Sequence, residues 1–139
     1  MSENIQQSGF REVPHTADRA VMVWAPTLDE LFLQAAYGMY QVIGIKSLSL
    51  KQYYRNISLF AADQEGLLVS FLSELLYFLE KDQLVFQEFQ LSREDESLRI
   101  EMSGKKVSSA YSEIKAVTYN ELEIRYSKGL YRATIVFDI

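Results

Sequence analysis

Two aspartates, one histidine and the last residue are the groups in this sequence whose types and spacing could do chemistry. His15 and Asp18 lie in the tetrapeptide HTAD at residues 15–18, and Asp138 and Ile139 end the printed chain of 139 residues. If the fold brings these segments together, two side-chain carboxylates, an imidazole and the terminal carboxylate surround one point. Hard divalent cations accept such oxygen ligands, so the pattern indicates an acidic cation site.

Each of these residues also has a structural interpretation. Asp18 could cap backbone amides in a turn between two strands, and an isolated His15 is typical of a structural histidine. Asp138 would ordinarily lie in a frayed tail, but residues 131–137 (YRATIVF) are strongly strand-like and should hold it at the edge of a sheet. Clustered carboxylates repel unless they are protonated or neutralised, and oxygen donors favour Ca²⁺, Mg²⁺ or Mn²⁺ over Zn²⁺.

The composition excludes several common catalytic sites. His15 is the only histidine and cysteine is absent, so multi-histidine metal sites, thiol nucleophiles and cysteine-based zinc sites cannot be built. The sequence has no GxSxG elbow, no Walker loop and no GxGxxG turn. We therefore predict no catalytic residue. A metal-dependent hydrolase acting on phosphoesters, with the same carboxylates and His15 as general base, is an alternative for which no other residue identifies a substrate pocket.

Two amphipathic helices should form the scaffold. Residues 27–30 (TLDE) form a capping box before apolar residues that recur at helical spacing as far as Ile43, and Gly44 is a natural residue to follow the helix. The second helix should start after Asp63, an N-cap candidate. Residues 67–79 then carry a wide apolar stripe of the kind that faces a core.

The remaining segments are extended and cluster late in the chain. Two hairpins should follow the second helix, the first with a bulge near Glu88 and the second with Gly129 in its turn. The order β-β-α-β-α-β-β-β-β predicts an α+β fold, with both helices packed on one face of a largely antiparallel sheet. The expected strands are residues 10–13, 19–25, 48–60, 84–91, 98–102, 122–126 and 131–137.

Length and charge limit the class of protein. The chain fits one domain, residues 1–139, in which the polar residues 1–9 form a flexible N-terminal tail. That tail is not a secretory signal, and no apolar run approaches the ~20 residues that span a bilayer, so we expect a cytoplasmic protein. The formal net charge of −5 and the scattered basic residues argue against direct nucleic-acid binding.

Five segments resemble, in order and spacing, the archease family. The similarity extends from about residue 10 to residue 139, and the ordered set is more specific than any single motif. The segments are residues 10–18 (FREVPHTAD), 27–32 (TLDELF), 63–76 (DQEGLL followed by LSELL), 114–119 (IKAVTY) and 137–139 (FDI).

The resemblance implies an accessory protein without enzymatic activity of its own. Such a protein activates an RtcB-type GTP-dependent RNA ligase, which joins RNA ends in tRNA splicing and RNA repair, by promoting its guanylylation and multiple turnover. The resemblance also implies a bound divalent cation, commonly Ca²⁺. It makes Asp18, Asp138 and Ile139 the cation ligands, with His15 as a further candidate. It makes Lys115 a contact to the ligase or its nucleotide site.

Two positions depart from the family pattern. Asn120 stands where the family often has histidine, which replaces an imidazole by an amide. Lys105 stands where the family often has glutamate, which reverses a charge. A general chaperone or protein-interaction module is the remaining alternative for the function.

Overall fold

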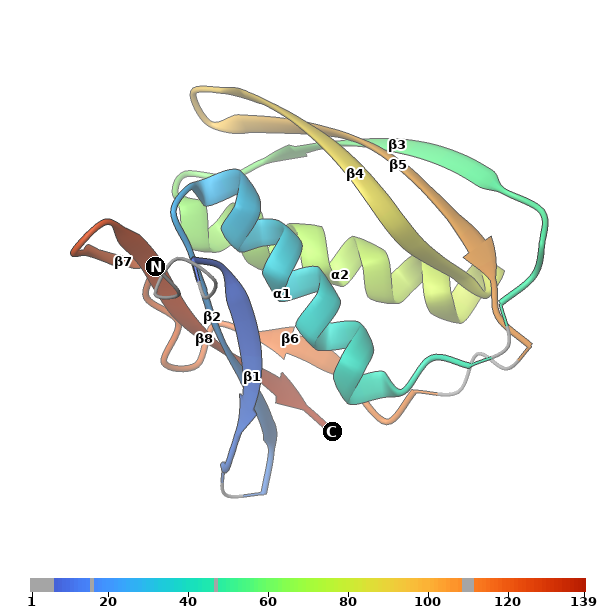
Figure 1. The fold of residues 1–139 in the computed structure, drawn as a ribbon, viewed down its shortest axis with the longest axis horizontal. Helices are drawn as coiled ribbons and strands as arrows, with labels where there is room; N and C mark the ends of the chain where they lie inside the picture. Colours follow the sequence, from blue (N-terminus) through green and yellow to red (C-terminus); the bar gives the residue numbers. More distant parts are fainter. Residues whose placement is uncertain (1–6, 16, 47, 109–111) are drawn as a thin grey trace. The chain divides into compact units, whose positions relative to one another are not determined.

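The computed structural model describes residues 7–15, 17–46, 48–108 and 112–139 (Figure 1). Within this part of the chain the helices and strands follow the predicted order, with one additional short strand, β6, which confirms the α+β class. The elements are β1 (Gly9–Val13), β2 (Arg19–Ala25), α1 (Leu28–Ile43), β3 (Tyr53–Phe60), α2 (Gln64–Asp82), β4 (Leu84–Glu94), β5 (Ser97–Lys106), β6 (Ala116–Thr118), β7 (Arg125–Ser127) and β8 (Leu130–Asp138).

The strands form two antiparallel sheets, whereas a single sheet was predicted. The chain divides into two compact units, one of Met1–Val42 with Ile114–Ile139 and the other of Ile43–Glu113. The first unit holds the sheet β1-β2-β8-β6, in which β7 also pairs with β8, and the second holds the sheet β3-β5-β4. The strands after α2 therefore go to different sheets, a choice that their hydrophobic alternation does not encode.

In the first unit, α1 begins and ends as its sequence predicts. The backbone amide of Glu30 donates to the hydroxyl of Thr27 at 3.1 Å, and Gly44 follows the helix with φ at +78°. The buried Gly38 rests against Val21 and Phe10, so the helix approaches the β1–β2 pair closely there. The carboxylate of Glu30 accepts from Gln34 at 2.8 Å; this is a bond within the helix.

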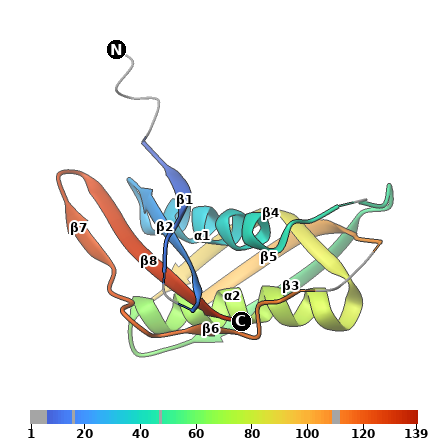
Figure 2. The same cartoon turned by 90° about the horizontal axis from the view of Figure 1, so that it is seen from below.

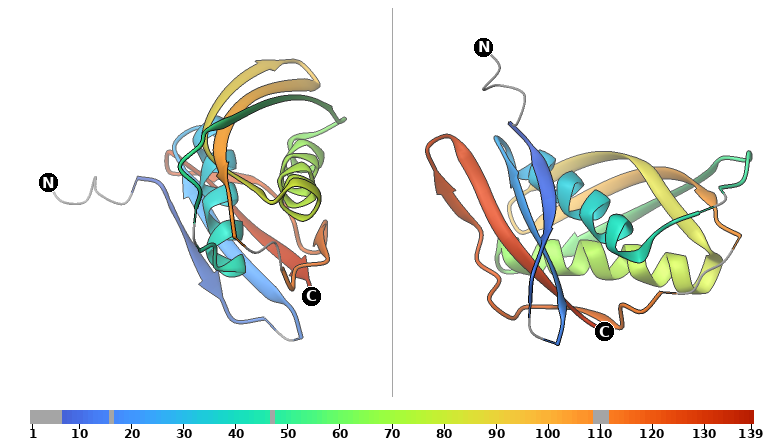
Figure 3. Two further views of the ribbon diagram at one scale, coloured as in Figure 1. Left: turned by 90° about the vertical axis from the view of Figure 1, so that its right-hand side faces the viewer. Right: turned by 60° about the horizontal axis from the view of Figure 1, so that its bottom comes forward.

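In the second unit, α2 packs against the three-stranded sheet, which curves over the helix in Figure 3 (left). Asp63 caps the helix by accepting from the amide of Gly66 at 2.7 Å, as predicted. The β4–β5 hairpin is confirmed, and its register shifts between Phe86 and Glu88, where the bulge was expected. The buried side chains of Phe71 and other α2 residues form the core with the inner face of the sheet.

Several strands differ in length from the prediction: β4, β5 and β8 are longer, and β7 is only Arg125–Ser127 where residues 122–126 were expected. The strand expected over residues 48–60 is shorter, because β3 starts at Tyr53 and Leu48 makes only an isolated bridge to Val107. β7 and β8 form the predicted second hairpin, visible in Figure 2, and Lys128 and Gly129 both adopt positive φ in its two-residue turn.

Two further predictions concerned a flexible N-terminal tail and the absence of a membrane-spanning segment. β1 begins at Gly9, inside the segment predicted as a tail, and residues 1–6 of that tail lie outside the described residues. In the described part of the chain, neither helix has the length and apolar character needed to cross a membrane.

Candidate functional site

Asp18 and Asp138 lie at the same end of two neighbouring strands of the first unit. β2 and β8 pair antiparallel, with Arg19 opposite Phe137. Asp18 directly precedes Arg19, and Asp138 directly follows Phe137. The register therefore brings the two aspartates level with each other at the end of the sheet.

Lys115 is held at the same end of the sheet from the other side of β8. β6 pairs with β8 so that Ala116 is opposite Asp138. The backbone amide of Lys115 donates to the carbonyl of Asp138 at 2.6 Å, and both residues are exposed. Ile139 follows with 38% of its surface exposed. An exposed end of three adjacent strands thus carries two carboxylates and one lysine.

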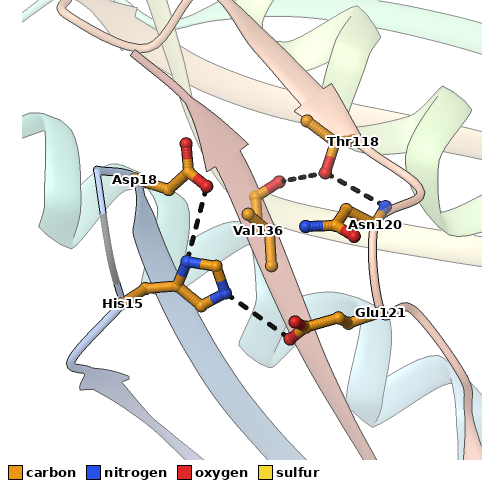
Figure 4. A network of polar contacts seen from close by, with 6 residues as sticks. All are labelled: His15, Asp18, Thr118, Asn120, Glu121 and Val136. Carbon is orange, nitrogen blue, oxygen red and sulfur yellow. Dashed lines mark hydrogen bonds and ion pairs between the residues drawn. The ribbon is translucent and has the colours of Figure 1, made fainter.

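His15 connects the β1–β2 loop to the segment that follows β6 (Figure 4). Its Nδ1 atom lies 3.4 Å from Oδ2 of Asp18, and its Nε2 atom lies 3.5 Å from Oε1 of Glu121. The imidazole is 20% exposed, and Nδ1 is shielded from solvent without a hydrogen bond of good geometry. Two carboxylates from distant parts of the chain therefore face one imidazole, and Glu121 was not identified from the sequence.

The segment that carries Glu121 is fixed by β6. The hydroxyl of Thr118 donates to the carbonyl of Val136 at 3.0 Å and accepts from the amide of Asn120 at 3.2 Å (Figure 4). Asn120 stands where the family often has histidine. Its backbone amide binds Thr118, and it directly precedes Glu121, the residue whose carboxylate faces His15. Glu121 itself has φ at +62°.

A second non-glycine residue with positive φ lies in the facing loop. Ala17 has φ at +64°, and alanine gains no side-chain hydrogen bond that favours this conformation. Ala17 follows His15 by two residues in the chain, and the carboxylate of Glu121 lies 3.5 Å from Nε2 of His15. Unfavourable backbone conformations of this kind persist where the surrounding structure imposes them, and they concentrate at functional sites. Thr16, between His15 and Ala17, lies outside the described residues.

A cation at this end of the sheet would need backbone oxygens as ligands in addition to side-chain carboxylates. Among the described residues, no group of three or more His, Asp or Glu side chains is gathered closely enough to hold a metal ion. Asp18 and Asp138 carry two carboxylates, so further donors would have to be main-chain oxygens, such as that of Ile139. Calcium and magnesium accept carbonyl, carboxylate and water oxygens together, so the residues present fit a hard cation.

Arg19, the residue after Asp18, binds a carboxylate of β1. The guanidinium of Arg19 forms two hydrogen bonds to the carboxylate of Glu12, Nε to Oε2 at 2.5 Å and Nη2 to Oε1 at 3.1 Å. These bonds lower the pKa of Glu12 below its ordinary value of 4.5, with burial opposing the shift. The forked pair therefore ties β1 to β2 just before the loop of the site.

Glu12→Gln should lower the free energy of unfolding at neutral pH but not at acidic pH. Because the folded-state pKa of Glu12 is depressed, its contribution is complete above pH 4.5 and is lost as the pH falls through the folded value. The pair is 30–40% exposed, so we expect a loss of about 0.5 kcal/mol at pH 7, and this difference should disappear as the pH falls through the folded-state pKa. Urea unfolding over a series of pH values from neutral to acidic measures this. Glu123→Gln, which breaks the more exposed pair with Arg125, is the control and should change stability less.

The fold and the site together define a class: a small α+β protein whose polar cluster lies at one end of an antiparallel sheet and lacks a recognisable catalytic constellation in the described residues. The model of the archease protein family matches residues 10–139. Its relatives include proteins named protein archease from Methanosarcina mazei, 38% identical over 96% of this chain and 98% of the relative, and from Aeropyrum pernix, 31% identical over 97% and 100%. The chain belongs to the archease family.

Solved structures agree with this assignment at the level of the fold. A crystal structure from Thermotoga maritima, described as an archease and possible chaperone, superposes with a TM-score of 0.67 at 19% identity and covers 93% of this chain and 96% of its own. A solution structure of a Methanobacterium thermoautotrophicum protein gives a TM-score of 0.69 at 24% identity, covering 94% and 99%.

Proposed function

We propose that this protein is a non-enzymatic activator of an RtcB-type GTP-dependent RNA ligase. The single observation that carries the proposal is the family match over residues 10–139, together with full-length relatives named protein archease. In this proposal it promotes guanylylation and repeated turnover of the ligase in tRNA splicing and RNA repair. A helper accelerates its partner only by stabilising an active state or intermediate more than the resting state.

The acidic end of β2 and β8 is the part of the protein that we propose meets the ligase. Asp18, Asp138 and an oxygen of Ile139 would hold a divalent cation, Ca²⁺ or alternatively Mg²⁺ or Mn²⁺, with His15 as a further ligand. Such an ion supplies positive charge that neutralises the neighbouring carboxylates and fixes the β1–β2 loop against the last strand. The level positions of the two aspartates in the β2–β8 register support this assignment.

Lys115 is proposed to contact the ligase or its nucleotide site. Its backbone is anchored on Asp138 and its side chain is exposed, so it can offer a positive charge beside the acidic end. The chain carries 14 basic and 19 acidic residues, and this excess of negative charge disfavours direct RNA binding. A protein partner is therefore the expected ligand of this surface.

The proposal is tested with the purified ligase of the same organism. We expect addition of the protein to raise the rate of single-turnover guanylylation and the number of RNA ends joined per ligase, by at least about tenfold. The measurements are transfer of labelled guanylate to the ligase and product formation under multiple turnover. A protein of similar size and charge from another family is the control for non-specific effects.

Three results would contradict the proposal. Equal ligase activity with and without the protein would remove the activator role. Metal-dependent hydrolysis of a phosphoester by the purified protein alone would favour the hydrolase alternative. Suppression of aggregation of unrelated proteins without any effect on the ligase would favour a general chaperone.

A further inference from the structure

The edge strand β3 of the second unit lacks the features that usually protect an exposed sheet edge. It pairs with β5 on one side, and no strand in the described residues pairs with its other side. Its eight residues (YYRNISLF) include no proline, no carboxylate and a single cation, Arg55, and its register with β5 is continuous. Edge strands of this kind readily pair with another chain.

The opposite edge of the same sheet is protected. β4 carries a register shift between Phe86 and Glu88, and its other charged residues, Arg93 and Glu94, lie towards its end. Bulges and charges hinder edge-to-edge pairing. The contrast between the two edges points to β3 as the side on which the sheet can be extended.

The side chains of β3 are complementary to those of a second β3. Tyr54 and Phe60, 71% and 75% exposed, lie at opposite ends of its outer face, with the exposed Asn56 and Ser58 between them. Antiparallel pairing with Ile57 opposite itself places Tyr54 of each copy opposite Phe60 of the other, and Asn56 opposite Ser58. Directly opposite aromatic pairs stabilise antiparallel sheets.

Other registers are less favourable, and charge supports this one. A shift of two residues in either direction sets Tyr54 opposite Ser58 or Phe60 opposite Asn56, which separates the aromatic rings. In the central register Arg55 faces Leu59, so no like charges are opposed. The carboxylates that give the chain its net charge of −5 are absent from β3 itself.

We propose that two copies of this chain associate through β3 in this register, forming a continuous six-stranded sheet. The partner is a second copy because, in this register, β3 sets aromatic residues opposite aromatic residues and polar residues opposite polar residues of its own sequence, and it opposes no like charges. Backbone groups along the two facing edges become hydrogen-bonded to each other, and the four exposed aromatic rings become two cross-strand pairs. This proposal is independent of the proposed ligase activation, which involves the other unit.

Sedimentation equilibrium of the full chain tests the proposal. We expect a monomer–dimer equilibrium that depends on concentration. The double variant Asn56→Lys with Ser58→Lys places a lysine opposite a lysine at both positions where residue 56 of one copy meets residue 58 of the other. It should raise the dimer dissociation constant about tenfold. Asn56→Lys with Ser58→Glu opposes lysine to glutamate across the interface, meets Glu101 and Arg99 of β5 with opposite charges, and should retain the dimer. Gln90→Lys with Ser92→Lys, on the exposed face of β4, adds the same charge as the first variant and should have no effect.

The register is read independently with single cysteines, since the chain has none. Ile57→Cys should form an intermolecular disulfide with copper–phenanthroline faster than Asn56→Cys or Ser58→Cys, because only residue 57 is opposite itself. A chain that stays monomeric at all concentrations would overturn the proposal. So would equal dissociation constants for the two residue-56/58 double variants, or fastest cross-linking at residue 56 or 58.

Discussion

Gly104→Ala is expected to destabilise the protein by at least about 3 kcal/mol, a large part of the 5–15 kcal/mol typical of a domain. Gly104 lies in the central strand β5, opposite Phe86 of β4 and Tyr53 of β3. A Cβ atom at this position would lie 2.0 Å from the carbonyl oxygen of Val85 and 2.6 Å from the Cα of Phe86. Because both contacts are with backbone, the clash can be relieved only by moving β4 away from β5.

Urea unfolding followed by circular dichroism measures this loss. Gly129→Ala is the matched control, since Gly129 has φ at +81° but open space around its Cα. The control should lose only about 1–2 kcal/mol, the cost of a left-handed conformation for an L-residue. A loss for Gly104→Ala no larger than that of the control would show that β4 and β5 can separate at little cost.

The features that sequence predicted best depend on residues close together in the chain. The caps of both helices at Thr27 and Asp63 rest on hydrogen bonds to amides three residues ahead, so their side chains and spacing suffice. The turn at Lys128 and Gly129 and the bulge before Glu88 are likewise local. The placement of Asp18 and Asp138 at one end of a sheet depends instead on the β2–β8 register, which only the structure provides.

The features that sequence did not predict depend on distant partners. β6 has only three residues, too few for a recognisable alternation, and exists because residues 116–118 pair with β8. The division into two sheets follows from which strand each hairpin meets, not from its own pattern. Glu121 reaches His15 only because β6 holds the segment before it, and no spacing in the sequence signals that meeting.

Asp138→Asn and Asp18→Asn should each reduce stimulation of the ligase by at least about tenfold. Both changes preserve side-chain size and replace an anionic oxygen by a neutral amide, and both sites are at least partly exposed, so the fold should be retained. Loss of one carboxylate would weaken the proposed cation site, because even supporting residues of metal sites typically contribute 10–100-fold. Single-turnover guanylylation with the cognate ligase measures the effect.

The control for charge removal is Asp95→Asn in the β4–β5 turn. Asp95 is exposed and has φ at +48°, a conformation that asparagine tolerates well. This variant makes the same chemical change far along the chain from the site, and it should activate the ligase as the original chain does. Equal activation by Asp138→Asn and Asp95→Asn would remove the acidic end from the mechanism, while leaving ligase activation itself intact.

Cation binding is separated from ligase activation by thermal unfolding with and without Ca²⁺. A ligand that binds only the folded state stabilises it by about 2.7 kcal/mol at a concentration of 100 Kd. We expect Ca²⁺ to raise the midpoint of the original chain and of Asp95→Asn, and to have little effect on Asp18→Asn or Asp138→Asn. If Ca²⁺ stabilises all four proteins equally, the ion binds elsewhere. If it stabilises none of them while the aspartate variants still lose activation, the carboxylates act on the ligase directly and not through a bound ion.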